Sequence, residues 1–222
     1  MIILALDTAS AATSVALVDG DVILNSAQHV DARRHAEVLA PMIAEVVAGQ
    51  AVDAVVCGVG PGPYTGLRVG VASAQSLGLA WGVPVVGICS LDAIAYEVRE
   101  AGFVGEFIAA LDARRKEVYW ARYDERRLAG PFVNRIDDLD PELLTMHWVG
   151  VGDEPRYPEA SALARIASPL LSAGAPVAER ITDLASHGTD DGATANQLGQ
   201  QQLLPPFPLY VRRPDAVVGV KS

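Results

Sequence analysis

A glycine-rich stretch at residues 58–70, Gly-Val-Gly-Pro-Gly-Pro-Tyr-Thr-Gly-Leu-Arg-Val-Gly, has the composition of an anion-binding loop. It follows an apolar run and enters a helical pattern, and the free N–H groups at the start of a helix attract anions. The stretch has neither the Gly-Lys-Ser/Thr of a Walker loop nor the spacing of a dinucleotide fingerprint. Two interpretations stay open: tight packing of a strand against a helix, or a weak anion or nucleotide site. The residues of such a site would be Asp7, Thr8, Gly60, Gly62, Thr65, Gly66 and Arg68.

Histidine and cysteine are too scattered to predict a metal site. The histidines are His29, His35, His147 and His187. They offer no pair at i, i+2 or i, i+4 spacing. Cys57 and Cys89 each lie in an apolar segment, which indicates reduced thiols in or beside the core. His35 follows two arginines at an expected helix start, so we interpret it as a surface or interface residue.

Charge and hydropathy narrow the functional classes. The chain has 222 residues, 50% of them hydrophobic, and a formal net charge of -10. The phosphate groups of nucleic acid are repelled by such a surface, so we expect any RNA to be held only indirectly. The basic turn at 112–116 is interpreted as a solvated hairpin tip, with an anion contact as the alternative. The first residues are typical of a strand rather than a signal peptide, and no apolar run approaches the roughly 20 residues of a membrane span, so a cytoplasmic protein without membrane contact is expected.

Hydrophobic patterns predict the elements that position these residues. Strands at 2–6, 14–18 and 21–25 should form an antiparallel meander with a tight Asp-Gly turn. A helix should cover 33–48, capped by Asp31, stopped by Gly49 and disturbed by Pro41. The other expected elements are strands at 52–59, 83–88, 107–112, 117–123, 132–136 and 148–152, and helices at 65–80, 91–99, 141–144 and 159–167.

This order is a βββαβα unit used twice, the second time in a worn form. It predicts an α/β fold in two lobes and resembles the duplicated architecture of the actin, Hsp70 and sugar-kinase superfamily. We expect an N-terminal lobe at 1–101 and a short, degenerate C-terminal lobe at 102–222. A loop with one short helix is expected at 186–201, and an extended tail at 205–212 should lie on the body.

Asp7 ends the first expected strand, where actin-like ATPases carry an Asp that positions metal-bound phosphate. Those ATPases pair it with an Asp-x-Gly-x-Thr turn in the second lobe. The corresponding turn here, at 112–114, is Asp-Ala-Arg. We therefore expect Asp7 to cap or brace the hairpin, with an ATP-hydrolysing cleft as the alternative.

Two helices carry stripes of small residues at a spacing of four, which places each stripe on one helix face. The stripes are Ala36, Ala40, Ala44 and Ala48 in the first helix and Gly66, Gly70, Ala74 and Gly78 in the second. The first helix has a separate bulky stripe for its own core, so its alanine side should be free. We predict a helical bundle with a partner; the alternative is packing within the lobe. The predicted interface residues are His35, Ala36, Ala40, Ala44, Gly70, Ala74 and Gly78.

Several motifs resemble those of the TsaB (YeaZ) family in order and spacing. They are Asp-Thr-Ala-Ser at 7–10, Arg-Arg-His-Ala-Glu at 33–37, Gly-Pro-Gly at 60–62, Thr-Gly-Leu-Arg-Val-Gly at 65–70, Gly-Val-Pro-Val-Val-Gly at 82–87 and Leu-Asp-Ala-Arg-Arg at 111–115. The resemblance covers residues 1–123 and the closing Tyr-Val-Arg at 210–212. One departure is Pro63-Tyr64, where the family has Ser-Phe, which changes the stiffness of the loop and removes a hydroxyl.

This resemblance implies a non-catalytic scaffolding subunit for the N6-threonylcarbamoyladenosine (t6A) modification beside the anticodon of tRNAs that read A-starting codons. The implied partners are a TsaD-type transferase and a TsaE-type ATPase, and a homodimer is the alternative assembly. No cofactor of its own is implied, while ATP or ADP at the partner interface is left open. The alternative function is an ATPase or small-molecule kinase of the same fold.

The resemblance also bears on catalysis. TsaD-type enzymes carry a metal-binding His-x-x-x-His pair at the positions of Ser90 and Ile94 in this chain. Neither residue is an imidazole, so we expect no catalytic residues, no metal site and no metallopeptidase activity.

Overall fold

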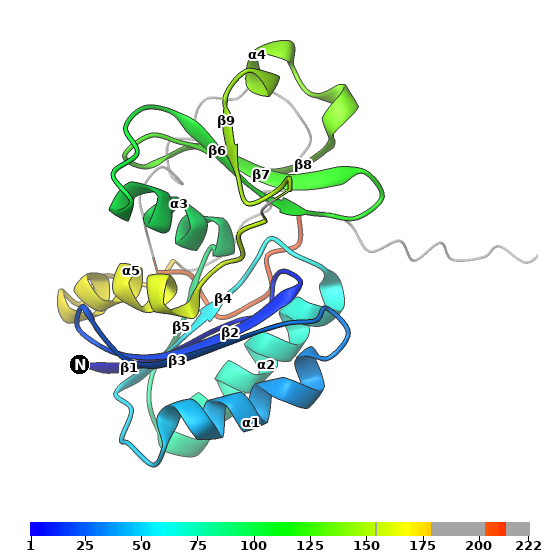
Figure 1. Ribbon diagram of the computed structural model, residues 1–222. Helices are drawn as coiled ribbons and strands as arrows, with labels where there is room; N and C mark the ends of the chain where they lie inside the picture. The colour runs from blue at the N-terminus through cyan, green and yellow to red at the C-terminus, as the bar shows by residue number, and fades with distance from the viewer. Residues whose placement is uncertain (154, 179–202, 212–222) are drawn as a thin grey trace, which may run out of the picture.

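The computed structural model describes residues 1–153, 155–178 and 203–211 (Figure 1). A first sheet of five strands has the order β3-β2-β1-β4-β5. Its strands are β1 (Ile2–Asp7), β2 (Ala12–Asp19), β3 (Val22–Val30), β4 (Ala54–Gly58) and β5 (Val85–Ile88). The first three form an antiparallel meander, and β4 and β5 continue the sheet in parallel with β1.

A second sheet of four strands has the order β8-β7-β6-β9. Its strands are β6 (Phe107–Asp112), β7 (Glu117–Tyr123), β8 (Arg127–Arg135) and β9 (His147–Val149). The helices are α1 (His35–Val47), α2 (Tyr64–Trp81), α3 (Ser90–Glu100), α4 (Pro141–Leu144), α5 (Ala160–Ser172) and the 3-10 turn η1 (Ile136–Asp138). The antiparallel meander followed by a parallel strand thus occurs in both sheets.

The helices form layers on the two sheets. In Figure 1, α1 and α2 cover one face of the first sheet and α5 covers the other. Helix α3 lies between α5 and the second sheet, which it contacts at β6 and β7. Leu163 and Ile166 of α5 belong to the same buried cluster as Ile3 of β1. Helix α3, from the first half of the chain, therefore packs on the second sheet, and α5, from the second half, packs on the first sheet. The division into lobes at residues 101–102 stays a prediction.

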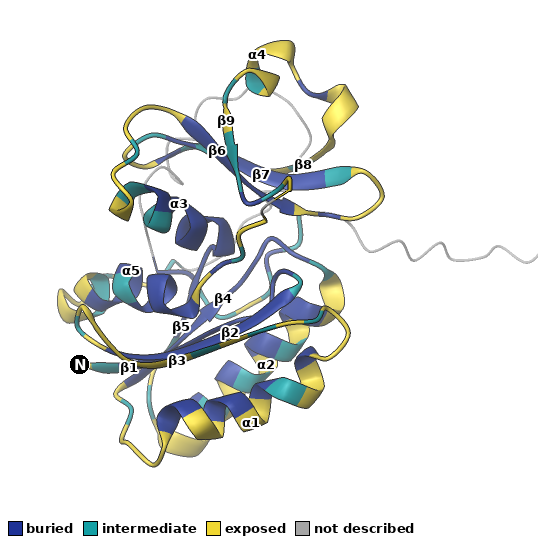
Figure 2. Cartoon of the chain, in the orientation of Figure 1, coloured by how far each residue is buried: buried dark blue, intermediate teal, exposed yellow. Residues whose placement is uncertain are grey.

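Burial follows this layering (Figure 2). The strands of the first sheet are buried apart from β3, and α1 and α2 expose their outer sides. Strand β3 is the exposed edge of the sheet, with Val22, Ile23 and Leu24 all more than 40% exposed. Within the described ranges, no helix is long and apolar enough to cross a membrane.

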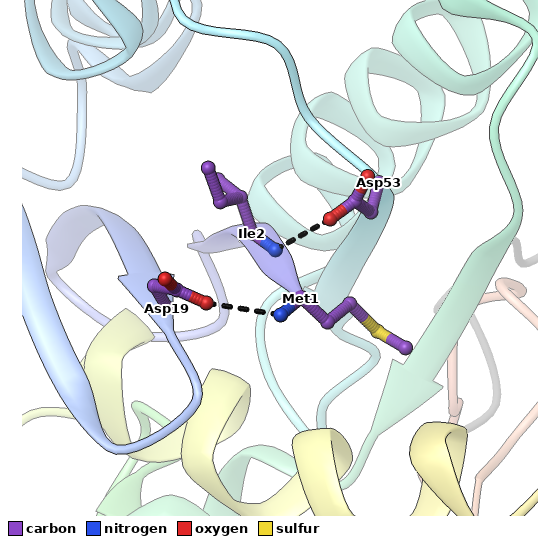
Figure 3. A network of polar contacts seen from close by, with 4 residues as sticks. All are labelled: Met1, Ile2, Asp19 and Asp53. Carbon is purple, nitrogen blue, oxygen red and sulfur yellow. Dashed lines mark hydrogen bonds and ion pairs between the residues drawn. The ribbon is translucent and has the colours of Figure 1, made fainter.

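Polar contacts fix the start of the first strand (Figure 3). The N-terminal ammonium of Met1 donates to Oδ1 of Asp19 at 2.9 Å, and the N–H of Ile2 donates to Oδ2 of Asp53 at 2.7 Å. The hydrogen bond and charge of Asp19 raise the pKa of the Met1 ammonium. These two carboxylates join β1 to the end of β2 and to the segment that enters β4.

Some predicted boundaries were wrong for physical reasons. Asp31 does not cap α1: its side chain accepts from the N–H of Arg33 in the preceding turn, and Arg34 takes the N-cap position. Pro41 lies inside α1 on its exposed side, where water can hydrate the carbonyl that lacks a donor. The helix ends on Ala48, which has a left-handed conformation with φ 49°, one residue before the predicted stop. The predicted loop and helix at 186–201 lie outside the described residues.

Candidate functional site

Asp7 lies at the end of β1, beside Gly58 at the start of the glycine-rich loop, and is 1% exposed. Its Oδ1 accepts from the N–H of Ala9 at 2.7 Å, and its Oδ2 accepts from the hydroxyl of Ser90 at 2.6 Å. Burial raises the pKa of the carboxyl to about 6, against the opposing effect of these hydrogen bonds. The carboxylate therefore joins β1 to Ala9 and Ser90 inside the protein, and it is not exposed to a cleft.

The glycine-rich loop packs directly on the segment that follows β1. A Cβ atom on Gly62 would lie 2.2 Å from the carbonyl oxygen of Ala9, and one on Gly66 would lie 2.4 Å from that of Thr8. The hydroxyl of Thr8 also donates to the carbonyl of Gly66 at 2.7 Å. The glycines are therefore required for close backbone approach. This geometry supports the tight-packing interpretation of the loop.

Few groups of the loop face solvent as an anion site would require. Of the predicted anion-binding residues, only Thr65 and Arg68 are exposed. Pro61 and Pro63 provide no N–H, which removes two donors from the turn before α2. The buried ones are Asp7, Thr8, Gly60, Gly62 and Gly66.

Arg68 is held by the C-terminal tail. Its Nε donates to the hydroxyl of Tyr210 at 3.0 Å, and its guanidinium carbon lies 3.7 Å from the ring centroid of Tyr64. The rings of Tyr64 and Tyr210 are stacked with centroids 5.0 Å apart. Tyr64 thus joins the start of α2 to the C-terminal tail through its contacts with Tyr210 and Arg68. Contacts between such distant residues have no local sequence signal, and the sequence analysis missed them.

The second phosphate turn of an actin-like ATPase also has a different structure here. Residues 112–116 form the tip of the β6–β7 hairpin, with Arg114 and Lys116 exposed. Oδ1 of Asp112 accepts from the N–H of Arg114 at 2.8 Å, so the carboxylate stabilises its own turn.

The two positions at which the sequence resemblance places a metal-binding histidine pair are buried in this chain. Ser90 and Ile94 are both 0% exposed. In the part of the chain that the structure describes, no group of three or more His, Cys, Asp or Glu side chains is placed to hold a metal ion. Cys57 and Cys89 are free and buried, and burial raises the pKa of both thiols to about 12, so they are inert core residues.

The two small-residue stripes face opposite ways. Ala36, Ala40 and Ala44 of α1 are exposed, as predicted for that face. The stripe of α2 contacts its own sheet, and its predicted role as a partner surface needs correction. A Cβ atom added to Gly70 would clash with the Thr8 hydroxyl, and one added to Gly78 would clash with the Val85 side chain. Ala74 is 0% exposed.

His35 is also corrected, because it is buried rather than at the surface, with 7% exposure. Its Nδ1 lies 2.8 Å from the hydroxyl of Thr13, and its ring contacts the first turn of α2 beside Gly66. Desolvation by burial lowers its pKa, which keeps the imidazole neutral at pH 7.

An apolar groove of about 660 Å³ runs between the exposed sides of α1 and α2. Ala40, Ala44 and Val47 line one wall, and Leu77 and Trp81 line the other. Trp81 is 41% exposed, and the neighbouring Leu79 is 87% exposed. Such a surface on a helix pair is typical of a protein-binding site. We call these five lining residues the alanine groove.

Comparisons with known proteins identify the family and several relatives of this chain. A family model described as TsaD, tRNA N6-adenosine threonylcarbamoyltransferase, matches residues 24–140. An uncharacterised protein of Mycobacterium tuberculosis is 40% identical over 96% of this chain and 93% of its own length. The tRNA threonylcarbamoyladenosine biosynthesis protein TsaB of Escherichia coli is 36% identical over 68% of this chain and 71% of its own length.

Two solved structures from Pseudomonas aeruginosa share the fold. One, described as a protein with similarity to peptidase YeaZ, has a TM-score of 0.70 and 27% identity and covers 95% of this chain and 99% of its own. The other, YeaZ, has a TM-score of 0.67 and 28% identity, with coverage of 80% and 96%. The chain has the predicted α/β fold with two sheets, and it belongs to the TsaB (YeaZ) family.

Proposed function

We propose that this chain is a non-catalytic scaffolding subunit of t6A biosynthesis that binds a TsaD-type transferase through the alanine groove. The role in t6A biosynthesis is taken from its relative in Escherichia coli, which is named for that pathway. The structural observation that carries the binding mode is the exposed alanine side of α1, which faces the exposed Trp81 and the half-buried Leu77 of α2.

The groove suits a partner helix for a steric reason. Helices pack at axial distances of about 8 to 10 Å, and small residues on one helix permit the closest approach of the next. Ala40 and Ala44 provide such a wall, while Leu77 and Trp81 provide apolar area whose burial favours association. Of the interface residues predicted from the sequence, the proposed interface therefore retains only the exposed alanines of α1, which are Ala36, Ala40 and Ala44.

A non-catalytic role is supported by the burial of Asp7 and by the hydrogen bonds that both of its carboxylate oxygens accept. Its two carboxylate oxygens bond to Ala9 and Ser90, and the Gly62 backbone packs against Ala9 beside it. A phosphate-positioning carboxylate needs an open face toward its ligand, and this one has none. The proposal includes a TsaE-type ATPase as a further partner, ATP or ADP held only at the interface between subunits, tRNA held indirectly, and a cytoplasmic location.

The test is a substitution in the groove. Ala40→Arg places a long charged side chain in the apolar wall and should abolish the complex with the TsaD-type protein of the same organism. The monomer should stay folded, because exposed substitutions usually change stability by no more than about 0.5 kcal/mol. Ala173→Arg is the matched control, since Ala173 is exposed at the end of α5 on the other face of the sheet.

Light scattering reports assembly and circular dichroism reports folding. Normal assembly of Ala40→Arg, or its unfolding, would show that the groove is not the interface. Catalysis is tested separately with the pure protein: magnesium-dependent ATP turnover that Asp7→Ala abolishes would overturn the non-catalytic assignment. Tight, salt-sensitive tRNA binding by the lone subunit would contradict indirect tRNA binding.

A further inference from the structure

A second cavity is lined by residues of β3, α3, α5 and the segment before α5. In Figure 1, α5 covers the face of the first sheet opposite to α1 and α2. The volume of the cavity is about 620 Å³. Polar and aromatic side chains dominate its lining, among them Gln28, Tyr96, Glu97, Tyr157, Glu159 and Arg165. We call it the β3–α3–α5 cavity. None of these residues belongs to the motifs of the family resemblance or to the alanine groove.

Glu97 is a residue of this cavity whose carboxylate has no hydrogen-bonding partner among the described residues. It is half-buried, and no described residue donates a hydrogen bond to its carboxylate or forms an ion pair with it within 4.0 Å. Burial raises its pKa to about 7, and the negative charge of Glu159 adds to the shift, while Arg156 opposes it. A carboxylate that has lost water without gaining a donor favours a cationic ligand.

Neither arginine of the cavity lining forms an ion pair with Glu97 within 4.0 Å, although Arg156 is near enough to lower its pKa. Arg165 donates to the carbonyl of Asp21 from Nε at 3.2 Å and from a terminal nitrogen at 2.8 Å, so its guanidinium is held at the turn before β3. Arg156 is exposed in the segment before α5. Glu100 adds a third carboxylate to the lining, which gives three acids against the one arginine that is not bonded to the backbone.

We infer that the β3–α3–α5 cavity binds a guanidinium or primary ammonium group, seated between Glu97 and Glu159. The aromatic walls fit this class of ligand, because Tyr96 and Tyr157 both line the cavity and tyrosine rings attract organic cations. Two carboxylates from different elements suit the several donors of such a group. The source is either a free polyamine-like cation or a basic side chain of a polypeptide.

Two probes separate these sources. Agmatine represents a free cation, and N-acetyl-arginine N-methylamide represents an arginine side chain in a polypeptide. N-acetyl-citrulline N-methylamide has the same shape without the charge and is the control ligand. Each is titrated into the full chain at low salt while amide chemical shifts are followed by NMR. We expect saturable shifts confined to β3, the C-terminal half of α3 and the start of α5 for at least one cation, and none for citrulline.

Variants locate the binding group. Glu97→Gln should weaken binding by about tenfold or more, since it removes a charge-assisted contact. It should fold, because it removes a desolvated charge, and Glu159→Gln provides a second test from the other wall. Glu45→Gln, exposed on α1, is the matched control and should bind as the parent does.

Binding should also tighten as pH rises through about 7, because Glu97 must be ionised to attract the cation. The charged or titratable groups that face it are Tyr96 and Glu100 on α3, Glu159 and Arg165 on α5, and Arg156 and Tyr157 in the preceding segment. Saturable binding of either cation supports the inference and names the source. Equal binding of citrulline, no saturable shift with either cation, or unchanged binding by both Gln variants would overturn it.

Discussion

The hydroxyl of Ser90 donates a 2.6 Å hydrogen bond to Asp7 and joins the start of α3 to the end of β1. The same oxygen accepts from the N–H of Gly60 at 3.2 Å. One buried hydroxyl thus links the first strand, the glycine-rich loop and the helix that leads to the second sheet. Ser90 therefore supplies a hydrogen bond to a carboxylate that is buried away from water.

The raised pKa of Asp7 predicts a pH-dependent stability. Because the folded-state pKa is about 6 and the ordinary value is 3.8, the stability from this group is full below about 3.8 and is lost as pH rises through about 6. Asp7→Asn removes the ionisation. Relative to the variant, the parent should lose about 2 kcal/mol of unfolding free energy between pH 4 and 7.

Urea unfolding at several pH values measures this difference. Ser90→Ala is the companion variant, because losing its hydrogen bond should raise the Asp7 pKa further and move the window to higher pH. A constant stability difference between the parent and Asp7→Asn across this range would show that Asp7 is ionised in the folded protein throughout.

A second prediction concerns the contact between Gly58 and the same carboxylate. A Cβ atom on Gly58 would lie 1.7 Å from Oδ2 of Asp7 and 2.8 Å from the Ser90 hydroxyl oxygen. Gly58→Ala should therefore cost about 3 kcal/mol or more of unfolding free energy, since the buried neighbours cannot move freely.

The control is Gly102→Ala, where no atom lies within 4 Å but φ is +84°. It should cost about 1 kcal/mol from backbone strain alone. Urea midpoints distinguish the two, and equal losses would mean that Asp7 can turn away from its hydrogen bonds.

Several strands of both sheets could be predicted because they are apolar runs bounded by turn residues. The strand predicted at 2–6 is found at Ile2–Asp7, and those at 107–112 and 117–123 are found with the same bounds. The packing of α5 on the first sheet could not be predicted. It depends on contacts such as the 2.9 Å hydrogen bond from the N–H of Ala160 to Ser14, which have no local signal.

The candidate site shows the same limit. Both stripes have the same spacing, yet only that of α1 is exposed. Helix α1 contacts the sheet through large residues such as Leu39 and Val46, whereas α2 approaches so closely at positions 70 and 78 that only glycine fits there. A stripe of small residues identifies a close contact, but the sequence does not say whether that contact lies within the lobe or with a partner.

A third prediction concerns the buried ion pair between α3 and the second sheet. Arg127 of β8 contacts Asp92 at 2.9 Å, and the hydroxyl of Tyr123 donates to the same carboxylate at 2.7 Å. Arg127→Met leaves Asp92 buried without a counter-charge and should cost about 3 to 5 kcal/mol of unfolding free energy.

The double variant Asp92→Asn with Arg127→Met should recover part of this loss, because no uncompensated charge remains. Thermal unfolding of the single and double variants tests the pair. A double variant at least as unstable as Arg127→Met alone would show that packing, rather than charge, explains the cost.

The last prediction concerns the tail, which crosses the edge of the first sheet. Leu204 exchanges backbone hydrogen bonds with Gly87, and the N–H of Leu209 donates to the carbonyl of Val59 at 2.7 Å. Tyr210 follows directly and is held by Arg68. Tyr210→Ala removes the stacked ring and the hydrogen bond of Arg68, so the end of the tail should open more often. Amide hydrogen exchange at Leu209 should accelerate by about fivefold, as expected for the loss of about 1 kcal/mol of local stability.

Arg68→Ala should accelerate the same amide, and the double variant should add little, because both residues belong to one contact. Arg33→Ala, an exposed arginine in the turn before α1, is the control and should leave Leu209 unchanged. Exchange at Leu204, which pairs with Gly87 farther from the stack, should change less than exchange at Leu209. Fully additive effects of Arg68→Ala and Tyr210→Ala would mean that the two side chains stabilise the tail independently, and unchanged exchange at Leu209 would mean that the buried Leu209 side chain holds the tail without them.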